Sequence, residues 1–173
     1  MDFTLPPEHE EFRQRARAFI AEHVMPCEDD PANYDPHENI RTDLLDALRG
    51  KARAVGLWAP QAPAERGGMG LPVSAWAPLY EEANRSIFGP VVLNCAAPDD
   101  GNMNVLAKIG TPAQQDWFLQ PIIDGKVRSS FAMTEPHPGS GSDPSMMLTT
   151  ATRNGSKYII NGLKWYITGA EEA

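Results

Sequence analysis

The chain has 173 residues, enough for one ordinary domain or for one domain and the beginning of a second. Its formal net charge of −8 argues against a general nucleic-acid surface, because phosphate binding needs clustered cations. No apolar run approaches the ~20 residues of a membrane span, and the acidic N-terminus resembles neither a secretory signal nor a mitochondrial presequence. We therefore expect a cytoplasmic protein that binds neither nucleic acid nor membrane.

Helical spacing of apolar residues predicts helices through the first two-thirds of the chain. The expected helices cover about residues 7–25, 43–55, 73–84, 90–96, 101–109 and 112–123. Pro26 should end the first helix, and Thr42 and Gly56 are the expected N-cap and C′ residue of the second. Thr111, followed by Pro112 and by Gln114 at the N3 position, indicates a capping box.

After Gly125 the pattern changes to strands and turns. Residues 127–134 are a strand candidate, and residues 135–144 form a loop rich in glycine and proline. Two further strands, 147–152 and 157–160, flank Asn154-Gly155, which predicts a hairpin with a type I′ turn. After a second Asn-Gly pair, residues 163–168 are the next strand.

These elements predict an α+β fold in two parts. Residues 1–126 form an all-α N-terminal domain, and residues 127–173 form the first strands of an antiparallel β-domain. A few strands with uncovered edges make a poor domain by themselves, so we expect the chain to be truncated.

Metal and acid–base sites find little support. The four histidines are scattered without ligand spacing, and Cys27 and Cys95 show no partner pattern, so we expect no metal site and two free thiols. Asp99 and Asp100 could do acid–base work or bind a cation. The positive end of the helix expected from Gly101 favours capping instead.

Two stretches carry candidates for ligand binding. The loop that follows Thr134 contains Gly-Ser-Gly-Ser at 139–142, whose backbone N–H groups and hydroxyls suit a phosphate or diphosphate; a flexible surface loop is the alternative. In the strand expected at 163–168, Trp165 and Tyr166 should point to opposite faces. Thr168 would then share a face with Tyr166, an arrangement that would suit a flavin ring; the alternative is that these aromatic residues only pack within the sheet.

In order and spacing, these segments resemble the acyl-CoA dehydrogenase family. The matching motifs are Gly110-Thr111-Pro112-x-Gln114, Trp117, Pro121, Gly125, Phe131-Ala132-Met133-Thr134-Glu135-Pro136, Gly141-Ser142-Asp143 and Ile160-Asn161-Gly162-x-Lys164-x-Tyr166-Ile167-Thr168. Upstream matches are Ala54-Val55-Gly56-Leu57-Trp58, Gly67-Gly68-Met69-Gly70 and Glu81-Glu82-Ala83-Asn84-Arg85-Ser86. The similarity spans nearly the whole chain. Residues 94–102 and 131–136 look most like the branch of family members 10 and 11, which is associated with longer or hydroxylated acyl chains.

The resemblance implies a flavoenzyme that desaturates acyl-CoA thioesters between Cα and Cβ, with FAD as the hydride acceptor. It implies an electron-transfer flavoprotein as the electron acceptor and a homodimer or homotetramer for the full-length protein. The family's catalytic Glu belongs to a C-terminal helical bundle, so no residue of this chain is assigned a catalytic role. An acyl-CoA oxidase and a non-catalytic helical interaction module are the alternatives.

The resemblance also assigns roles by position. The residues that would contact the flavin or its diphosphate are Phe131, Met133, Thr134, Gly141, Ser142, Tyr166, Ile167 and Thr168. Ser142 would also face the acyl-CoA. Two departures stand out: the family usually has Trp at the position of Tyr166, and the loop after Pro136 is two residues longer than usual.

Overall fold

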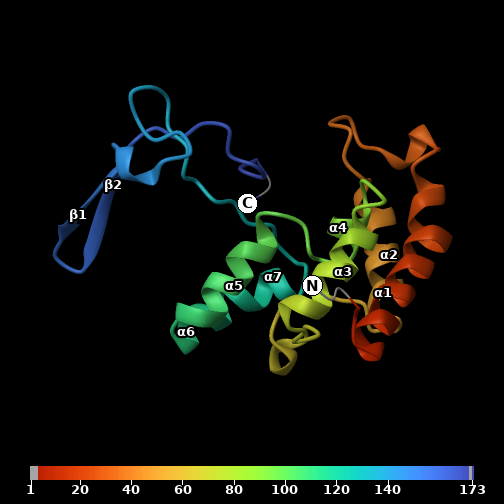
Figure 1. The fold of residues 1–173 in the computed structure, drawn as a ribbon. Helices are drawn as coiled ribbons and strands as arrows, with labels where there is room; N and C mark the ends of the chain where they lie inside the picture. The colour runs from red at the N-terminus through yellow and green to blue at the C-terminus, as the bar shows by residue number, and fades with distance from the viewer. Residues whose placement is uncertain (1–3, 172) are drawn as a thin grey trace. The chain divides into compact units, whose positions relative to one another are not determined.

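The computed structural model describes residues 4–171 and 173, and it divides the chain into two compact units, Met1–Lys126 and Val127–Ala173. The first unit contains the helices and the second a β-hairpin (Figure 1), so the α+β fold class is confirmed. The α-helices are α1 (Pro7–Phe19), α2 (Thr42–Ala54), α3 (Val73–Ala83), α4 (Gly89–Val92), α5 (Asp99–Ile109), α6 (Pro112–Gln114) and α7 (Gln120–Ile123), and the strands are β1 (Thr150–Asn154) and β2 (Lys157–Asn161).

Shorter helical turns complete the first unit. Helix α1 continues into a π-helical turn at Ile20–Val24 and a 3₁₀ turn at Met25–Cys27, and a second π-helical turn, Gln115–Leu119, joins α6 to α7. The helical stretch that begins at α1 thus ends beside Pro26, as predicted, because proline has no N–H to extend the hydrogen-bond ladder. Further 3₁₀ turns lie at Pro31–Asn33 and Ala64–Arg66, and the second unit contains one at Pro144–Met146.

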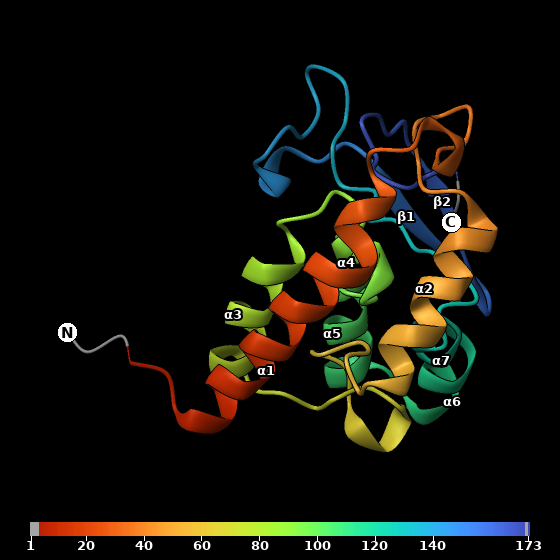
Figure 2. The same ribbon diagram turned by 90° about the vertical axis from the view of Figure 1, so that its right-hand side faces the viewer.

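Helices α1 and α3 lie side by side (Figure 2) around one buried carboxylate. Glu82 of α3 is 2% exposed, and it accepts hydrogen bonds from Arg17 Nη2 at 2.8 Å and from Arg13 Nη1 at 3.3 Å, both on α1. Arg17 Nε adds a bond at 3.0 Å, and Arg85 Nη1 adds a fourth at 3.4 Å. A buried charge is tolerated only when it is paired and hydrogen-bonded, so this cluster ties the two helices together.

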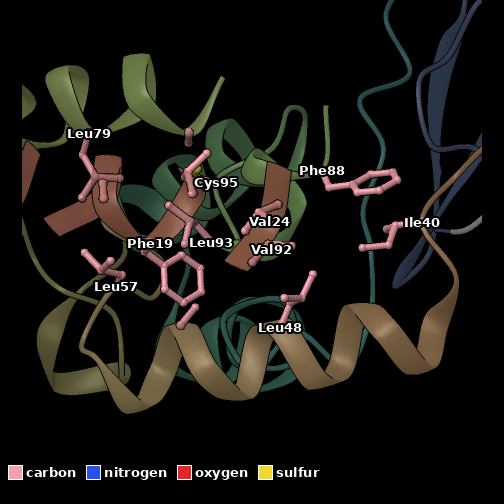
Figure 3. Close-up of a cluster of buried hydrophobic side chains, with 14 residues drawn as sticks. Phe19, Val24, Ile40, Leu48, Leu57, Leu79, Phe88, Val92, Leu93 and Cys95 are labelled. Carbon is pink, nitrogen blue, oxygen red and sulfur yellow. The ribbon is translucent and has the colours of Figure 1, made fainter. Parts of the chain in front are cut away.

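Two apolar clusters form the core of the first unit. The larger one gathers side chains from α1, α2, α3 and α4 (Figure 3), and it includes Ile20, Leu57, Leu79 and Leu93. The smaller one consists of Trp58, Ala59, Ala62, Met103, Leu119, Ile122 and Ile123. The indole N–H of Trp58 donates to the Ile123 carbonyl at 2.9 Å, which satisfies the polar atom of this buried ring.

The helix ends partly match the sequence predictions. The capping box is confirmed, since Thr111 Oγ1 accepts from Gln114 N–H at 3.3 Å and Gln114 Oε1 accepts from Thr111 N–H at 2.8 Å. Gly56 follows α2 with φ of +67°. Thr42 is wrong as an N-cap, because it is the first residue of α2 and Arg41 occupies the N-cap without a side-chain cap bond.

Two other boundaries differ from expectation. Helix α5 begins at Asp99 rather than at Gly101, so Asp99 and Asp100 lie in its first turn, and Asp100 Oδ1 accepts from Gly101 N–H at 2.7 Å. The helix expected at 90–96 is the four-residue α4, because Asn94 takes a left-handed φ of +55°. The Asn94 amide donates to the carbonyls of Ile122 and Ile123 at the end of α7.

The second unit contains the predicted hairpin. Strands β1 and β2 pair antiparallel, from Thr150 opposite Asn161 to Asn154 opposite Lys157. The two loop residues are Gly155 and Ser156, and φ is +63° at Gly155 but not positive at Ser156. The predicted type I′ turn, which needs positive φ at both positions, is therefore wrong; glycine at the first position suits a type II′ turn.

The strands expected at 127–134 and 163–168 are not formed. Met133 N–H donates to the Phe131 carbonyl at 3.1 Å, a local turn that removes this donor from any ladder. Tyr166 has a left-handed φ of +51°, which breaks the extended backbone of the second segment. Among residues 4–171 and 173, no helix combines the length and apolar character needed to cross a membrane.

Candidate functional site

Residues 129–134 and 164–169 lie beside each other in the second unit and run in opposite directions. Trp165 N–H donates to the Thr134 carbonyl at 3.2 Å. At the other end, a Cβ built on Gly169 would lie 3.1 Å from the carbonyl oxygen of Ser129. The structure therefore brings together two groups of sequence-predicted residues that are separated by about thirty positions. These residues are Phe131, Met133, Thr134, Tyr166, Ile167 and Thr168.

The carboxylate of Glu135 lies at the centre of this arrangement and is 4% exposed. Its Oε1 accepts from Thr149 N–H at 2.8 Å, from the Thr149 hydroxyl and from Lys164 Nζ at 2.9 Å. Its Oε2 accepts from Leu148 N–H at 2.6 Å and from Ser140 N–H at 3.3 Å. These bonds, led by the Thr149 hydroxyl and the Leu148 amide, hold the pKa of Glu135 well below its usual range, so the group is an anion at neutral pH.

The carbonyl of Met133 is a second point of attachment. It accepts from Lys164 Nζ at 2.9 Å and from the Ser140 hydroxyl at 3.0 Å. Glu135 N–H also donates to the Ser140 carbonyl at 2.6 Å, and Ser140 is fully buried. The start of the loop is thus fixed on both sides of Thr134.

The remainder of the loop is open. Gly141 and Ser142 are exposed, and a Cβ on Gly141 would meet nothing within 4 Å. The neighbouring Asp143 accepts from Ser145 N–H at 2.9 Å and from the Ser145 hydroxyl at 2.7 Å, which lowers its pKa. This carboxylate is therefore engaged in its own local turn.

The aromatic pair is arranged differently from the sequence prediction. Trp165 and Tyr166 were expected on opposite faces of a strand, but their ring centroids are 4.8 Å apart and both rings are exposed. The left-handed backbone of Tyr166 is the physical reason, since it removes the alternation of an extended strand. Tyr166 is 83% exposed and Phe131 61% exposed, so each offers a ring face to a ligand.

Sequence reasoning missed the groups that hold this site together. The sequence motifs contain Glu135 and Lys164 but do not indicate that the two pair, and no motif includes Thr149. Lys164 lies 29 positions from Glu135, so no local spacing signals their pairing. The available signal was a Glu within the mostly apolar stretch 131–136. Such a position indicates a buried acid, and a buried acid needs hydrogen-bond partners.

A separate pocket of about 350 Å³ occurs in the first unit, lined among others by Arg53, Trp58 and Arg66. Its arginines are already paired: Arg53 donates to the Asp124 carbonyl and lies 3.9 Å over the Trp58 ring, and Arg66 pairs with Asp116 at 3.0 Å. The described residues contain no group of three or more His, Cys, Asp or Glu that could hold a metal ion. The second unit therefore remains the stronger candidate.

Two family models account for most of the chain. The acyl-CoA dehydrogenase N-terminal domain matches residues 6–126, and the acyl-CoA dehydrogenase middle domain matches residues 130–173. This chain belongs to the acyl-CoA dehydrogenase family. The predicted resemblance to this family, and to its members 10 and 11, is confirmed.

Individual acyl-CoA dehydrogenases extend the match. The probable acyl-CoA dehydrogenase FadE2 of Mycobacterium tuberculosis is 40% identical, over 99% of this chain and 42% of that protein. Acyl-CoA dehydrogenase family member 11 of Gallus gallus is 38% identical, over 90% of this chain and 20% of that protein. A crystal structure of acyl-CoA dehydrogenase complexed with FAD from Bacillus anthracis has a TM-score of 0.70 at 28% identity, over 98% of this chain and 28% of that chain. The chain thus spans less than half the length of these relatives.

Proposed function

We propose that this chain forms part of the flavin and substrate site of an FAD-dependent acyl-CoA dehydrogenase, which oxidises the Cα–Cβ bond of acyl-CoA thioesters. The observation that carries the proposal is the antiparallel placement of residues 129–134 and 164–169. It joins both groups of candidate residues on one frame, which consists of these two segments and the buried Glu135 that anchors them. The FAD bound by the relative from Bacillus anthracis supports the choice of cofactor.

The residues present fit a flavin. Phe131 and Tyr166 expose ring faces to which a planar heterocycle can stack, and the hydroxyls of Thr134 and Thr168 can hydrogen-bond to its polar edge. Gly141 leaves room for close backbone approach, so the diphosphate belongs at Gly141 and Ser142. When bound, the flavin supplies the hydride acceptor, and the chain supplies orientation and electrostatics.

Other roles follow from the family. Ser142 also faces the acyl-CoA, and electrons leave to an electron-transfer flavoprotein. The complete protein assembles as a homodimer or homotetramer. No residue of this chain is proposed as the catalytic base, so the 173 residues alone should not oxidise acyl-CoA.

Titration with FAD tests the cofactor site. With ¹⁵N-labelled chain, we expect amide shifts to concentrate at residues 131–142 and 166–168, with binding that is weak and needs FAD in excess. Thr134→Val and Thr168→Val each remove a hydroxyl without changing side-chain shape, and each should weaken binding roughly fivefold, the value of one hydrogen bond of ~1 kcal/mol. Thr152→Val, at an exposed position of β1, is the matched control and should bind FAD as the unmodified chain does. Equal affinity of all three variants would contradict the assignment.

Activity needs a longer protein. Residues 1–173 fused to the C-terminal remainder of the FadE2 relative should give a yellow protein that reduces a dye when acyl-CoA is added. The isolated chain, assayed beside it, should do neither. Turnover of acyl-CoA by the isolated chain would refute the proposal that the base lies elsewhere.

A further inference from the structure

We propose that Glu135 is a positioning residue of the flavin site, whose buried carboxylate holds residues 129–134, the loop 137–143 and residues 164–169 in one arrangement. The inference deepens the function proposed above and rests on it for the identity of the ligand. The hydrogen bonds described above for the Glu135 carboxylate involve none of the residues that are proposed to contact the flavin. Its partners are Ser140, Leu148, Thr149 and Lys164, each of which belongs to a segment next to the site.

The hydrogen bonds show how the segments are joined. Lys164 Nζ bridges Glu135 Oε1 and the Met133 carbonyl, at 2.9 Å to each. The next residue, Trp165, donates from its N–H to the Thr134 carbonyl. Thr134 therefore lies between Met133 and Glu135, both of which Lys164 contacts, and Tyr166 lies two residues after Lys164. Ser140 is bonded to the same carboxylate and leads directly into Gly141 and Ser142.

Two glycines show how closely the chain packs against the carboxylate and against its partner Thr149. A Cβ at Gly139 would lie 2.4 Å from Glu135 Oε2, and a Cβ at Gly162 would lie 2.0 Å from the Oγ1 of Thr149, a partner of Glu135. Contacts this short force a neighbour to move. The backbone thus approaches the carboxylate closely from the loop, and it approaches the partner Thr149 closely from the segment after β2.

The chemistry of the partners requires a carboxylate at position 135. Five donor groups face its two oxygens: two hydroxyl or ammonium groups, from Thr149 and Lys164, and three backbone N–H groups. An ionised carboxylate accepts on both oxygens, whereas a glutamine amide accepts on one and presents an NH₂ donor on the other side. Glu135→Gln keeps the size of the side chain but sets a donor against donors, which leaves buried groups without partners.

The test measures the stability of the frame separately from its affinity for FAD. In the 173-residue chain, amide hydrogen exchange is followed at Leu148, Thr149 and Trp165 by NMR, and FAD affinity is measured on the same samples. Glu135→Gln should speed exchange at these amides about tenfold, since hydrogen bonds to charged groups are the stronger ones. It should weaken FAD binding by a similar factor, while the β1–β2 ladder and the first unit keep their exchange rates. Glu171→Gln, an exposed carboxylate of the same unit, is the matched control and should change neither quantity.

A second, milder variant keeps the proposal testable if Glu135→Gln unfolds the whole second unit. Lys164→Met removes one cationic donor and keeps the other four bonds to Glu135, so it should speed exchange at Trp165 and weaken FAD binding while the hairpin persists; Lys157→Met on β2 is its control. Unchanged exchange at Trp165 in both variants would overturn the proposal, as would faster exchange without any loss of FAD affinity. If the unmodified chain shows no FAD-dependent shifts at all, the proposed cofactor site fails, and the exchange rates alone then decide whether Glu135 holds the frame.

Discussion

At Gly89, the first residue of α4, a side chain has no room. An added Cβ would lie 2.0 Å from the carbonyl oxygen of Ala83, a backbone atom at the end of α3. Gly50, within α2, has nothing within 4 Å of the same position. The two glycines therefore serve different purposes: one permits close approach of two chain segments, and the other is a replaceable residue of a helix.

Alanine at each position should separate these cases. Gly89→Ala should lower the free energy of unfolding by about 1–3 kcal/mol, the usual result of overpacking. Gly50→Ala should raise it by about 0.5–1 kcal/mol, because alanine loses less conformational freedom in a helix. Urea denaturation followed by circular dichroism measures both. Equal effects at the two positions would show that packing at Gly89 is looser than the structure indicates.

Residue identity suggested the candidate site but did not indicate its local geometry. Motif order pointed to Thr134, Ser142 and Tyr166, yet nothing in the sequence indicated that Tyr166 has positive φ. A non-glycine residue takes this conformation only when its surroundings compensate for the strain. Those surroundings include the bond from Trp165 N–H to Thr134, which joins residues 31 positions apart in the chain.

At the scale of elements, α1 and α3 are joined by the carboxylate of Glu82. The helical pattern of the sequence predicts α3 but does not indicate that this carboxylate is buried. Glu81 and Glu82 are adjacent in sequence, but Glu81 is exposed and Glu82 is buried among three arginines. The Arg17 hydrogen bond and the neighbouring guanidinium charges lower the pKa of Glu82 below its usual value of 4.5. The folded state thus favours the ionised form of Glu82.

Glu82 should make stability depend on pH. Because its folded pKa lies below the unfolded value, its contribution is complete above about pH 4.5 and is lost as the pH falls through the folded pKa. Glu82→Gln should cost about 2 kcal/mol at pH 7, the scale of hydrogen bonds between charged groups, and should flatten the acid limb of the stability curve. The free energy of unfolding in urea at pH 7 and pH 3.5 checks this. Glu81→Gln should follow the unmodified protein at both values.

At the scale of the whole molecule, both apolar clusters belong to the first unit. The last buried residue of these clusters along the chain is Ile123, three residues before the boundary at Lys126. The second unit is built differently: both faces of its hairpin are exposed, and its buried centre is the hydrogen-bonded Glu135. The helical unit therefore contains the apolar burial that folding requires.

Residues 1–126 alone should keep their fold, and their two thiols report it. Cys95 is buried in the larger cluster, and burial raises the pKa of its thiol, whereas Cys27 is partly exposed. Because the thiolate is the reactive form, a disulfide reagent should modify Cys27 in the native protein and Cys95 only after unfolding in urea. Cys95 reacting as fast as Cys27 in residues 1–126 would show that the helical unit depends on the rest of the chain.

The sequence by itself determined the features that depend on neighbouring residues. Helical periodicity, the capping box at Thr111 and Gln114, and the hairpin at Gly155 arise from interactions within a few positions, so local reasoning predicted them. Only the tertiary structure decided that residues 127–134 and 163–168 are not strands and that Glu135 lies at their junction. Those outcomes depend on contacts between residues about thirty positions apart, where a buried charge must find its partners.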